Sequence, residues 1–196
     1  ALAAEAIATL EDLAGATPED RAGALRAQTT VALAQRDFTA AKKYADAELA
    51  LVDSAQAEPR LRYQALMAAG GASWGLEAYQ DAEARFREAL AVALVDAHPD
   101  ELNVAKARTN LGMALQTQSR YEEAEGLQQL ALATDEKILG AEHASTLAVR
   151  RDLALCEYRL GRRSRQLRAE TEVRRIVPLG EDTLALAGGE QVDIPD

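Results

Sequence analysis

The sequence predicts an all-α protein, an α-solenoid in which antiparallel helix hairpins are stacked side by side. The main observation is a phrase in which an aromatic residue is followed three positions later by alanine. It occurs three times, at intervals of 41 and 42 residues, beginning at Phe38, Tyr79 and Tyr121. A fixed interval of this length is typical of stacked helical repeats, each of which buries its apolar side against its neighbours. The apolar residues are mostly alanine, and only 4% of the chain is aromatic, which favours closely packed helices over β-sheets.

One helix is predicted before the repeats. Residues 1–16 carry large apolar side chains at helical spacing, namely Ile7, Leu10 and Leu13. Thr17 and Pro18 then begin the next helix, because threonine is a favoured N-cap and proline is tolerated in a first turn. We expect the N-terminal helix to be either a cap or the second half of an earlier repeat.

Four helix hairpins are expected over residues 17–177, which with the N-terminal helix makes nine helices. The third hairpin shows the pattern most clearly. Gly112 in its first helix and Ala124 in its second allow the two helices to approach closely, and Tyr121 fills their junction. One hairpin cannot bury such an apolar stripe alone, so its neighbours must cover it. The tail, residues 178–196, contains two adjacent glycines and a proline, and we expect it to be irregular.

The composition excludes several classes of function. A net charge of −10 and an isoelectric point near 4.8 argue against a nucleic-acid-binding protein, which needs a basic surface. No apolar run approaches the ~20 residues that span a bilayer, and the first residues lack the basic leader of a signal peptide. We therefore expect no membrane partner and a cytoplasmic location. Cys156 is the sole cysteine, which leaves neither an intramolecular disulfide nor a thiolate zinc site.

No residue pattern indicates catalysis or cofactor binding. His98 and His143 occupy equivalent turns between repeats, and two adjacent hairpins would hold them too far apart for one metal ion. We expect both histidines to cap helices. Gly70 and Gly71 do not follow a strand, so we interpret them as positions of close helix packing rather than as a phosphate-binding loop. The sequence therefore predicts no enzyme activity, no cofactor and no metal.

At these residues the chain resembles the tetratricopeptide repeat (TPR) family. In that family a Leu-Gly pair lies in the first helix, here Leu111 and Gly112, and an aromatic residue opens the second helix, here Tyr121. The interval is similar to that of the kinesin-light-chain variety, which also occurs in many bacterial signalling proteins. The resemblance covers roughly residues 22–177 and implies a right-handed superhelix that binds proteins or peptides without catalysis.

The resemblance also implies that the first helix of each hairpin lines a concave groove. The candidate groove residues are Met67, Trp74, Lys106, Asn110, Met113, Arg151, Leu155 and Tyr158. Aromatic and apolar side chains of this kind anchor a peptide, while amide and cationic groups fix its register. The alternative for Trp74 and Tyr158 is that they pack between helices.

A second candidate surface follows the last turn. Between residues 161 and 177 six arginines stand against two glutamates, and a docking patch would include Arg162, Arg163, Arg165 and Arg168. The alternative is a solvated outer face at the end of the array. We expect a peptide- or protein-binding module within a larger bacterial signalling or regulatory protein. The alternatives are an oligomerisation scaffold that associates through its terminal helices and a sensory domain for a small ligand or signalling peptide.

Overall fold

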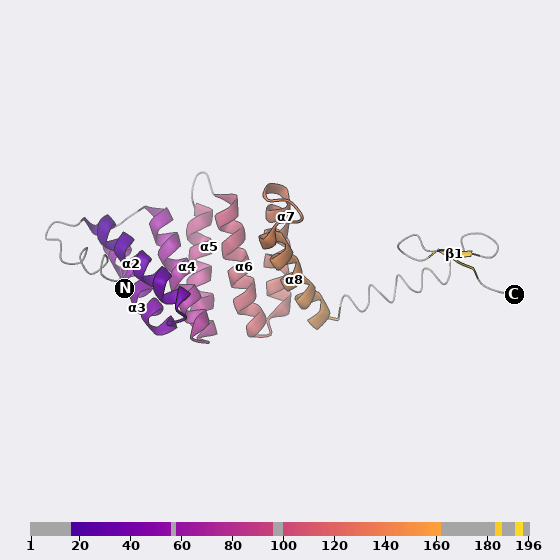
Figure 1. The fold of residues 1–196 in the computed structure, drawn as a ribbon, viewed down its shortest axis with the longest axis horizontal. Coiled ribbons are helices and arrows are strands. Elements are labelled where there is room, and N and C mark those ends of the chain that lie inside the picture. Colours follow the sequence, from indigo (N-terminus) through magenta and orange to yellow (C-terminus); the bar gives the residue numbers. More distant parts are fainter. Residues whose placement is uncertain (1–16, 56–57, 96–99, 162–182, 186–190, 194–196) are drawn as a thin grey trace.

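The structure is a computed structural model that describes residues 17–55, 58–95, 100–161, 183–185 and 191–193. Within these residues seven helices follow one another along one axis, as Figure 1 shows. Their bounds are α2 (Pro18–Ala34), α3 (Phe38–Ser54), α4 (Pro59–Gly75), α5 (Tyr79–Val95), α6 (Glu101–Thr117), α7 (Tyr121–Ile138) and α8 (Ala144–Arg159). The predicted all-α solenoid is confirmed. The helices α2–α3, α4–α5 and α6–α7 form the first, second and third hairpins, and α8 begins the fourth.

Local capping explains where the helices begin. Thr17 and Asp20 form a capping box at the start of α2, where each side chain satisfies a backbone N–H of the other residue. The Asp100 carboxylate accepts hydrogen bonds from the backbone N–H groups of Leu102 and Asn103 at the start of α6. At α8 the cap is His143, whose Nδ1 accepts a hydrogen bond from the N–H of Ser145 at 3.1 Å. The capping role predicted for His143 is confirmed, whereas His98 lies outside the described residues.

The hairpin turns share one conformation at one repeat position. Each contains a residue in the left-handed region, at φ values of 59°, 59°, 61° and 66°: Arg36, Glu77, Ser119 and Gly161. Three of these residues carry a side chain, although this region favours glycine. A residue of this conformation therefore recurs at intervals of 41, 42 and 42 residues, and at the first three positions the chain turns there into the second helix of its hairpin.

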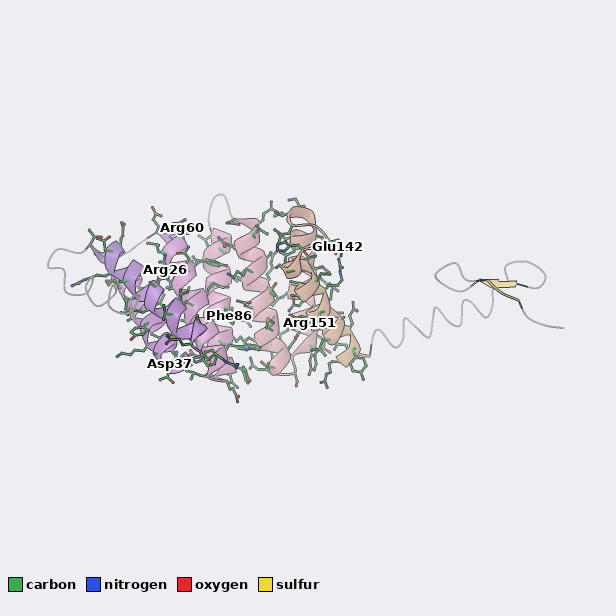
Figure 2. The ribbon with its side chains drawn as sticks, viewed as in Figure 1. Arg26, Asp37, Arg60, Phe86, Glu142 and Arg151 are labelled. Atoms are coloured by element: carbon green, nitrogen blue, oxygen red, sulfur yellow. The ribbon has the colours of Figure 1, made fainter. Side chains whose placement is uncertain are left out.

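In the second and third hairpins a glycine of the first helix lies against a side chain of the second helix. In the second hairpin Gly70 lies against the ring of Phe86, and a Cβ at Gly70 would be 2.5 Å from that ring. In the third hairpin Gly112 lies against the amide of Gln128, which a Cβ would approach to 2.7 Å. Phe86 and Gln128 are both buried, and Figure 2 labels Phe86 within the array. Close helix packing, as the sequence predicted, accounts for Gly70 and Gly112 but not for Gly71, whose added Cβ would meet no atom within 4 Å.

The helices form two layers. We call α2, α4, α6 and α8 the first-helix layer, and α3, α5 and α7 the second-helix layer. Helices of the first-helix layer touch across hairpins, since α2 contacts α4 and α6 contacts α8. A curved stack brings helices closest together on its inner side, which makes the first-helix layer the inner one.

Polar contacts also join neighbouring hairpins. The Tyr63 hydroxyl donates a hydrogen bond to the carbonyl of Asn103 at 2.9 Å, which joins the second hairpin to the third. Ion pairs also join neighbouring hairpins, at N–O distances of 2.7 to 2.8 Å: Lys42–Asp81, Arg120–Glu83 and Arg150–Glu136. Partly exposed pairs of this kind contribute at most about 1 kcal/mol each, so the core remains the main source of stability.

The C-terminal tail differs from its expected irregular structure. Two three-residue strands, β1 (Thr183–Ala185) and β2 (Gln191–Asp193), pair in antiparallel register with Leu184 opposite Val192. These two strands are the only part of the tail that the structure describes, and the other residues of the predicted tail lie outside the described ranges. The predicted N-terminal helix over residues 1–16 and the second helix of the fourth hairpin lie outside the described residues.

Candidate functional site

The candidate site is the exposed side of α4, α6 and α8, which we call the first-helix face. All eight predicted groove residues belong to these three first helices, at several repeat positions, and their assignment to a binding groove stays a prediction. Met67, Trp74, Asn110 and Met113 are half-buried, whereas Lys106, Arg151, Leu155 and Tyr158 are exposed. The face thus changes along the array, from a half-buried apolar part on α4 to an exposed part on α8.

An exposed apolar stripe runs along α8. Leu147, Leu155 and Tyr158 are 44%, 43% and 66% exposed, and the spacing along the helix puts Arg151 on the same side. Large apolar side chains of this exposure in one stripe are typical of a binding surface. Leu147 was not among the predicted site residues. The residue at the same repeat position in the third hairpin is Ala105, which is buried beside Val149 of α8. Repeat position alone would therefore place Leu147 in the core.

The part of the face on α4 is packed more tightly. Trp74 contacts the core around Phe86, and its ring meets Tyr79 edge-on with centroids 5.3 Å apart. Because Trp74 ends α4 and Tyr79 begins α5, the tryptophan closes the turn of its own hairpin. Met67 packs against two core clusters. Both residues support the fold as well as the face, which agrees with the alternative that Trp74 packs between helices.

Gly71 lies on α4 between Met67 and Trp74. It is half-buried, and an added Cβ would meet no atom within 4 Å, so no packing partner requires a glycine there. A glycine within a helix costs about 1 kcal/mol relative to alanine. Its position leaves free space on the first-helix face directly beside two large apolar side chains.

On α6 the face presents Lys106, Asn110 and Met113, at spacings of four and three residues. Gln116 follows on the same side, and its Nε2 donates hydrogen bonds to the carbonyl of Asp152 at 2.9 Å and to Sγ of Cys156 at 3.0 Å. These contacts hold α6 against α8.

The charged groups of the face are unevenly paired. Arg151 donates to the Asp152 carboxylate at 2.9 Å, yet its side chain remains 74% exposed while that of Asp152 is 10% exposed. The Arg159 guanidinium lies over the Tyr121 ring at 6.0 Å. Lys106 is exposed and forms no ion pair within the described residues. The predicted docking patch of Arg162, Arg163, Arg165 and Arg168 lies outside those residues.

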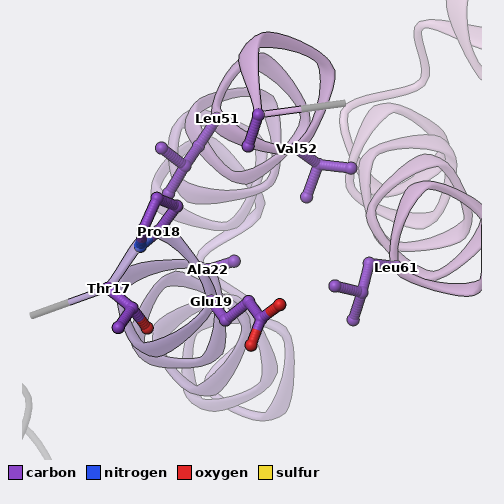
Figure 3. Close-up of a pocket in the computed structure, with 8 residues that line it drawn as sticks. Thr17, Pro18, Glu19, Ala22, Leu51, Val52 and Leu61 are labelled. Carbon is purple, nitrogen blue, oxygen red and sulfur yellow. The ribbon is translucent and has the colours of Figure 1, made fainter. Parts of the chain in front are cut away.

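A separate cavity lies at the other end of the array. It has a volume of about 300 Å³ between the start of α2, the end of α3 and the start of α4, and Figure 3 shows its lining. Ala22, Leu51, Val52 and Leu61 give it apolar walls. One repeat later the equivalent cavity is only about 130 Å³, since Tyr63 occupies the position of Ala22. This cavity shares no residue with the first-helix face.

The sole cysteine is part of the core between α6 and α8. Burial raises the pKa of the Cys156 thiol, against the smaller effect of the hydrogen bond from Gln116. Among the residues that the structure describes, no three His, Cys, Asp or Glu side chains come together as a metal site would require. No helix in the described ranges combines the length and the apolar character that crossing a bilayer demands.

Comparisons with known proteins agree with this architecture. Residues 103–166 match the model of the tetratricopeptide repeat family. No curated protein matches the sequence. The apo form of RapI has a similar structure, with a TM-score of 0.69 and 16% identity over 89% of this chain. That match covers 57% of RapI, so this chain spans a little over half of its length.

Two further structures resemble the chain. BtubC (BKLC) from P. vanneervenii matches with a TM-score of 0.68 and 18% identity, over 91% of this chain and 73% of that one. A putative kinesin light chain from Podosopora anserina with TPR-like repeats matches with a TM-score of 0.70 and 18% identity. That match covers 89% of this chain and 83% of the other. The predicted resemblance is therefore confirmed: the chain has the fold of a tetratricopeptide repeat solenoid, and residues 103–166 match the family itself.

Proposed function

We propose that this chain is a non-catalytic module that captures an extended or helical segment of a partner protein across its first-helix face. The observation that carries the proposal is the exposed stripe of Leu147, Leu155 and Tyr158 on α8. Leucine at more than 40% exposure and tyrosine at 66% present apolar area that a partner would bury. Tyrosine in particular is frequent among residues that dominate binding energy.

Two further observations support this assignment. Met113 on α6 and Met67 on α4 are half-buried, and Gly71 leaves open space beside Met67, so a long segment on the first-helix face would contact several hairpins. The repeat fold is a scaffold for protein–protein interaction. One similar structure, a Rap protein, is a complex with Competence and Sporulation Factor, and it matches with a TM-score of 0.63. By this analogy of fold we propose a role in a bacterial signalling or regulatory protein located in the cytoplasm.

The test is a peptide-display selection on the chain, run in parallel on a Leu155→Ala, Tyr158→Ala double variant. Both side chains are exposed, so their truncation leaves the core intact, whereas Trp74→Ala would disturb the contact with Tyr79. The matched control is Leu130→Ala, which removes a 54% exposed leucine from the second-helix layer. A motif enriched by the wild type and by the control, but lost in the double variant, supports the proposal.

The scaffold alternative rests on the same exposed stripe, since a second copy could cover it. Sedimentation of the wild type and of the double variant separates the two functions. Dimers that disappear in the double variant, with no peptide enriched by the wild type, would replace the proposed function by self-association.

A further inference from the structure

We propose that the cavity between α2, α3 and α4 binds a small arylalkylamine with a ring hydroxyl, a molecule of the class of tyramine. This site is separate from the first-helix face, so the inference goes beyond the proposed function and does not depend on it. It comes from comparing the cavity with its counterpart one repeat later, which the chain fills with a side chain of its own.

The second hairpin shows what this space can hold. Tyr63, the fifth residue of α4, is 6% exposed and occupies the space there, so that only about 130 Å³ remain. Its hydroxyl donates a hydrogen bond to the carbonyl of Asn103, the third residue of α6, at 2.9 Å. A phenol at this repeat position therefore has apolar residues around its ring and an acceptor for its hydroxyl.

The first hairpin has similar walls but lacks the ring. Ala22, the fifth residue of α2, has a methyl group where Tyr63 has its phenol, and the cavity there measures about 300 Å³. Leu51 and Val52 line it with apolar side chains. An apolar cavity of about 150 Å³ is enough to bind benzene, so this one accommodates a benzene ring with a short side chain.

The acceptor for a ring hydroxyl is present as well. Leu61 is the third residue of α4, as Asn103 is of α6, and it lines the cavity. A backbone carbonyl has two lone pairs, so it can accept a hydrogen bond from a ligand in addition to the one within its helix. A phenol placed like the ring of Tyr63 would therefore donate to the carbonyl of Leu61.

The charge at the rim differs between the two repeats. Glu19, the second residue of α2, lines the cavity and is exposed, and Figure 3 shows its side chain extending toward Leu61. It forms no ion pair within the residues that the structure describes. The same position in α4 is a cation, Arg60. A carboxylate at the rim favours a ligand with a positive charge beside its ring, which selects an amine over a neutral phenol.

The test measures binding of tyramine to the whole chain by isothermal titration calorimetry. Two relatives each lack one group: phenethylamine lacks the hydroxyl, and para-ethylphenol lacks the ammonium. We expect tyramine to bind with a dissociation constant of about 1 mM or lower. Loss of the hydroxyl should weaken binding by about threefold to tenfold, and loss of the ammonium by about twofold to fivefold.

Two substitutions locate the ligand. Ala22→Tyr supplies the ring that the second hairpin has, so it should raise the melting temperature and abolish tyramine binding. Glu19→Gln should remove the advantage of tyramine over para-ethylphenol, whose own affinity should not change. Because Glu19 is exposed, this variant tests the site without altering the core, and circular dichroism verifies that both variants are folded. The matched control is Glu122→Gln, which makes the same change of charge in the first turn of α7 and should leave all three affinities unchanged.

Equal affinity of tyramine for the wild type and for folded Ala22→Tyr would place the ligand elsewhere and overturn the inference. Equal affinities of the three ligands for the wild type, or no binding of tyramine at about 10 mM, would overturn it as well. A lower melting temperature of Ala22→Tyr together with no bound amine would show that the chain itself fills the cavity. The Leu155→Ala, Tyr158→Ala variant should bind tyramine as the wild type does, which separates this site from the first-helix face.

Discussion

The second and third hairpins close the same junction with different chemistry. In the second hairpin the ring of Phe86 fills the space beside Gly70, and in the third the amide of Gln128 fills the space beside Gly112. Both inserted side chains are buried and are 42 residues apart. Phe86 belongs to an apolar cluster, whereas the Oε1 of Gln128 has no hydrogen-bond partner among the described residues and its Nε2 lies 3.5 Å from the carbonyl of Thr109. The same backbone therefore accepts either side chain, at different cost in stability.

This difference indicates that the volume of the inserted side chain matters more at this junction than its polarity. A glycine on the first helix and a side chain of matching volume on the second are common to both hairpins. Burying an amide oxygen without a partner costs free energy, so the third hairpin should be the weaker of the two.

Removing the inserted side chain should have the largest effect on stability and should differ most between the two hairpins. Phe86→Ala should lower the free energy of unfolding by about 3–5 kcal/mol, as a buried ring is lost and a cavity remains. Gln128→Ala should cost clearly less, because it also removes the unpartnered oxygen. Urea unfolding followed by circular dichroism measures both variants. Equal losses would show that the amide contributes as much as the ring.

Filling the glycine positions tests whether the inserted side chain can move. Gly70→Ala should destabilise by about 1–3 kcal/mol, since its Cβ would overlap the rigid Phe86 ring. Gly112→Ala should cost less, because the end of Gln128 is flexible and can shift. Thermal unfolding of both variants gives the ranking, and the reverse order would contradict a shape-selective junction.

Gly71 provides the matched control for Gly70, one residue away in the same helix. Gly71→Ala should raise the free energy of unfolding by about 0.5–1 kcal/mol, since alanine restricts the unfolded chain and favours the helix. Its Cβ would enter free space on the first-helix face. A loss of stability on the scale of Gly70→Ala would mean that Gly71 also packs closely.

The smallest expected effect is a pH dependence in the first hairpin, where the buried Glu48 pairs with the partly exposed Arg26 at the positions that Ala89 and Met67 occupy in the second hairpin. Burial raises the pKa of the Glu48 carboxyl above 4.5, against the opposing effect of the hydrogen bond from Arg26. A carboxyl group whose pKa is higher in the folded protein than in the unfolded one stabilises the fold. This stabilisation is complete at a pH below the pKa in the unfolded protein, and it is lost as the pH rises through the pKa in the folded protein. The wild type should therefore lose stability between about pH 5 and about pH 7 relative to Glu48→Gln.

Urea midpoints of both proteins across this range measure the effect. The contribution of Asp81 to the pH dependence can be separated from that of Glu48. The hydrogen bond from Lys42 lowers the pKa of the Asp81 carboxyl below 3.8, so the stability that Asp81 contributes is lost only in stronger acid. Parallel curves for the wild type and Glu48→Gln between about pH 5 and about pH 7 would contradict the assignment to Glu48.

The sequence predicted the repeat architecture well because the interval is a local pattern. Phe38, Tyr79 and Tyr121 begin α3, α5 and α7, where the repeated phrase places the second helices. Side-chain burial was less predictable, because it depends on contacts between segments. Gly70 and Gly71 are alike in sequence, and only the position of Phe86 separates a packed glycine from an open one. The site residues remain a prediction, but the exposure of Leu147 required knowing which helix lies beside it.

The ion pairs between hairpins have a mechanical consequence. Lys42–Asp81, Arg120–Glu83 and Arg150–Glu136 each join neighbouring hairpins, so a change in superhelical pitch would lengthen or shorten them. Their strength falls with ionic strength, whereas that of the buried contacts does not. The resistance of the array to stretching thus has two parts: the core contributes independently of salt, and the ion pairs contribute less as salt is added. Stretching it by a few ångströms would break charged contacts first and leave the hairpins folded.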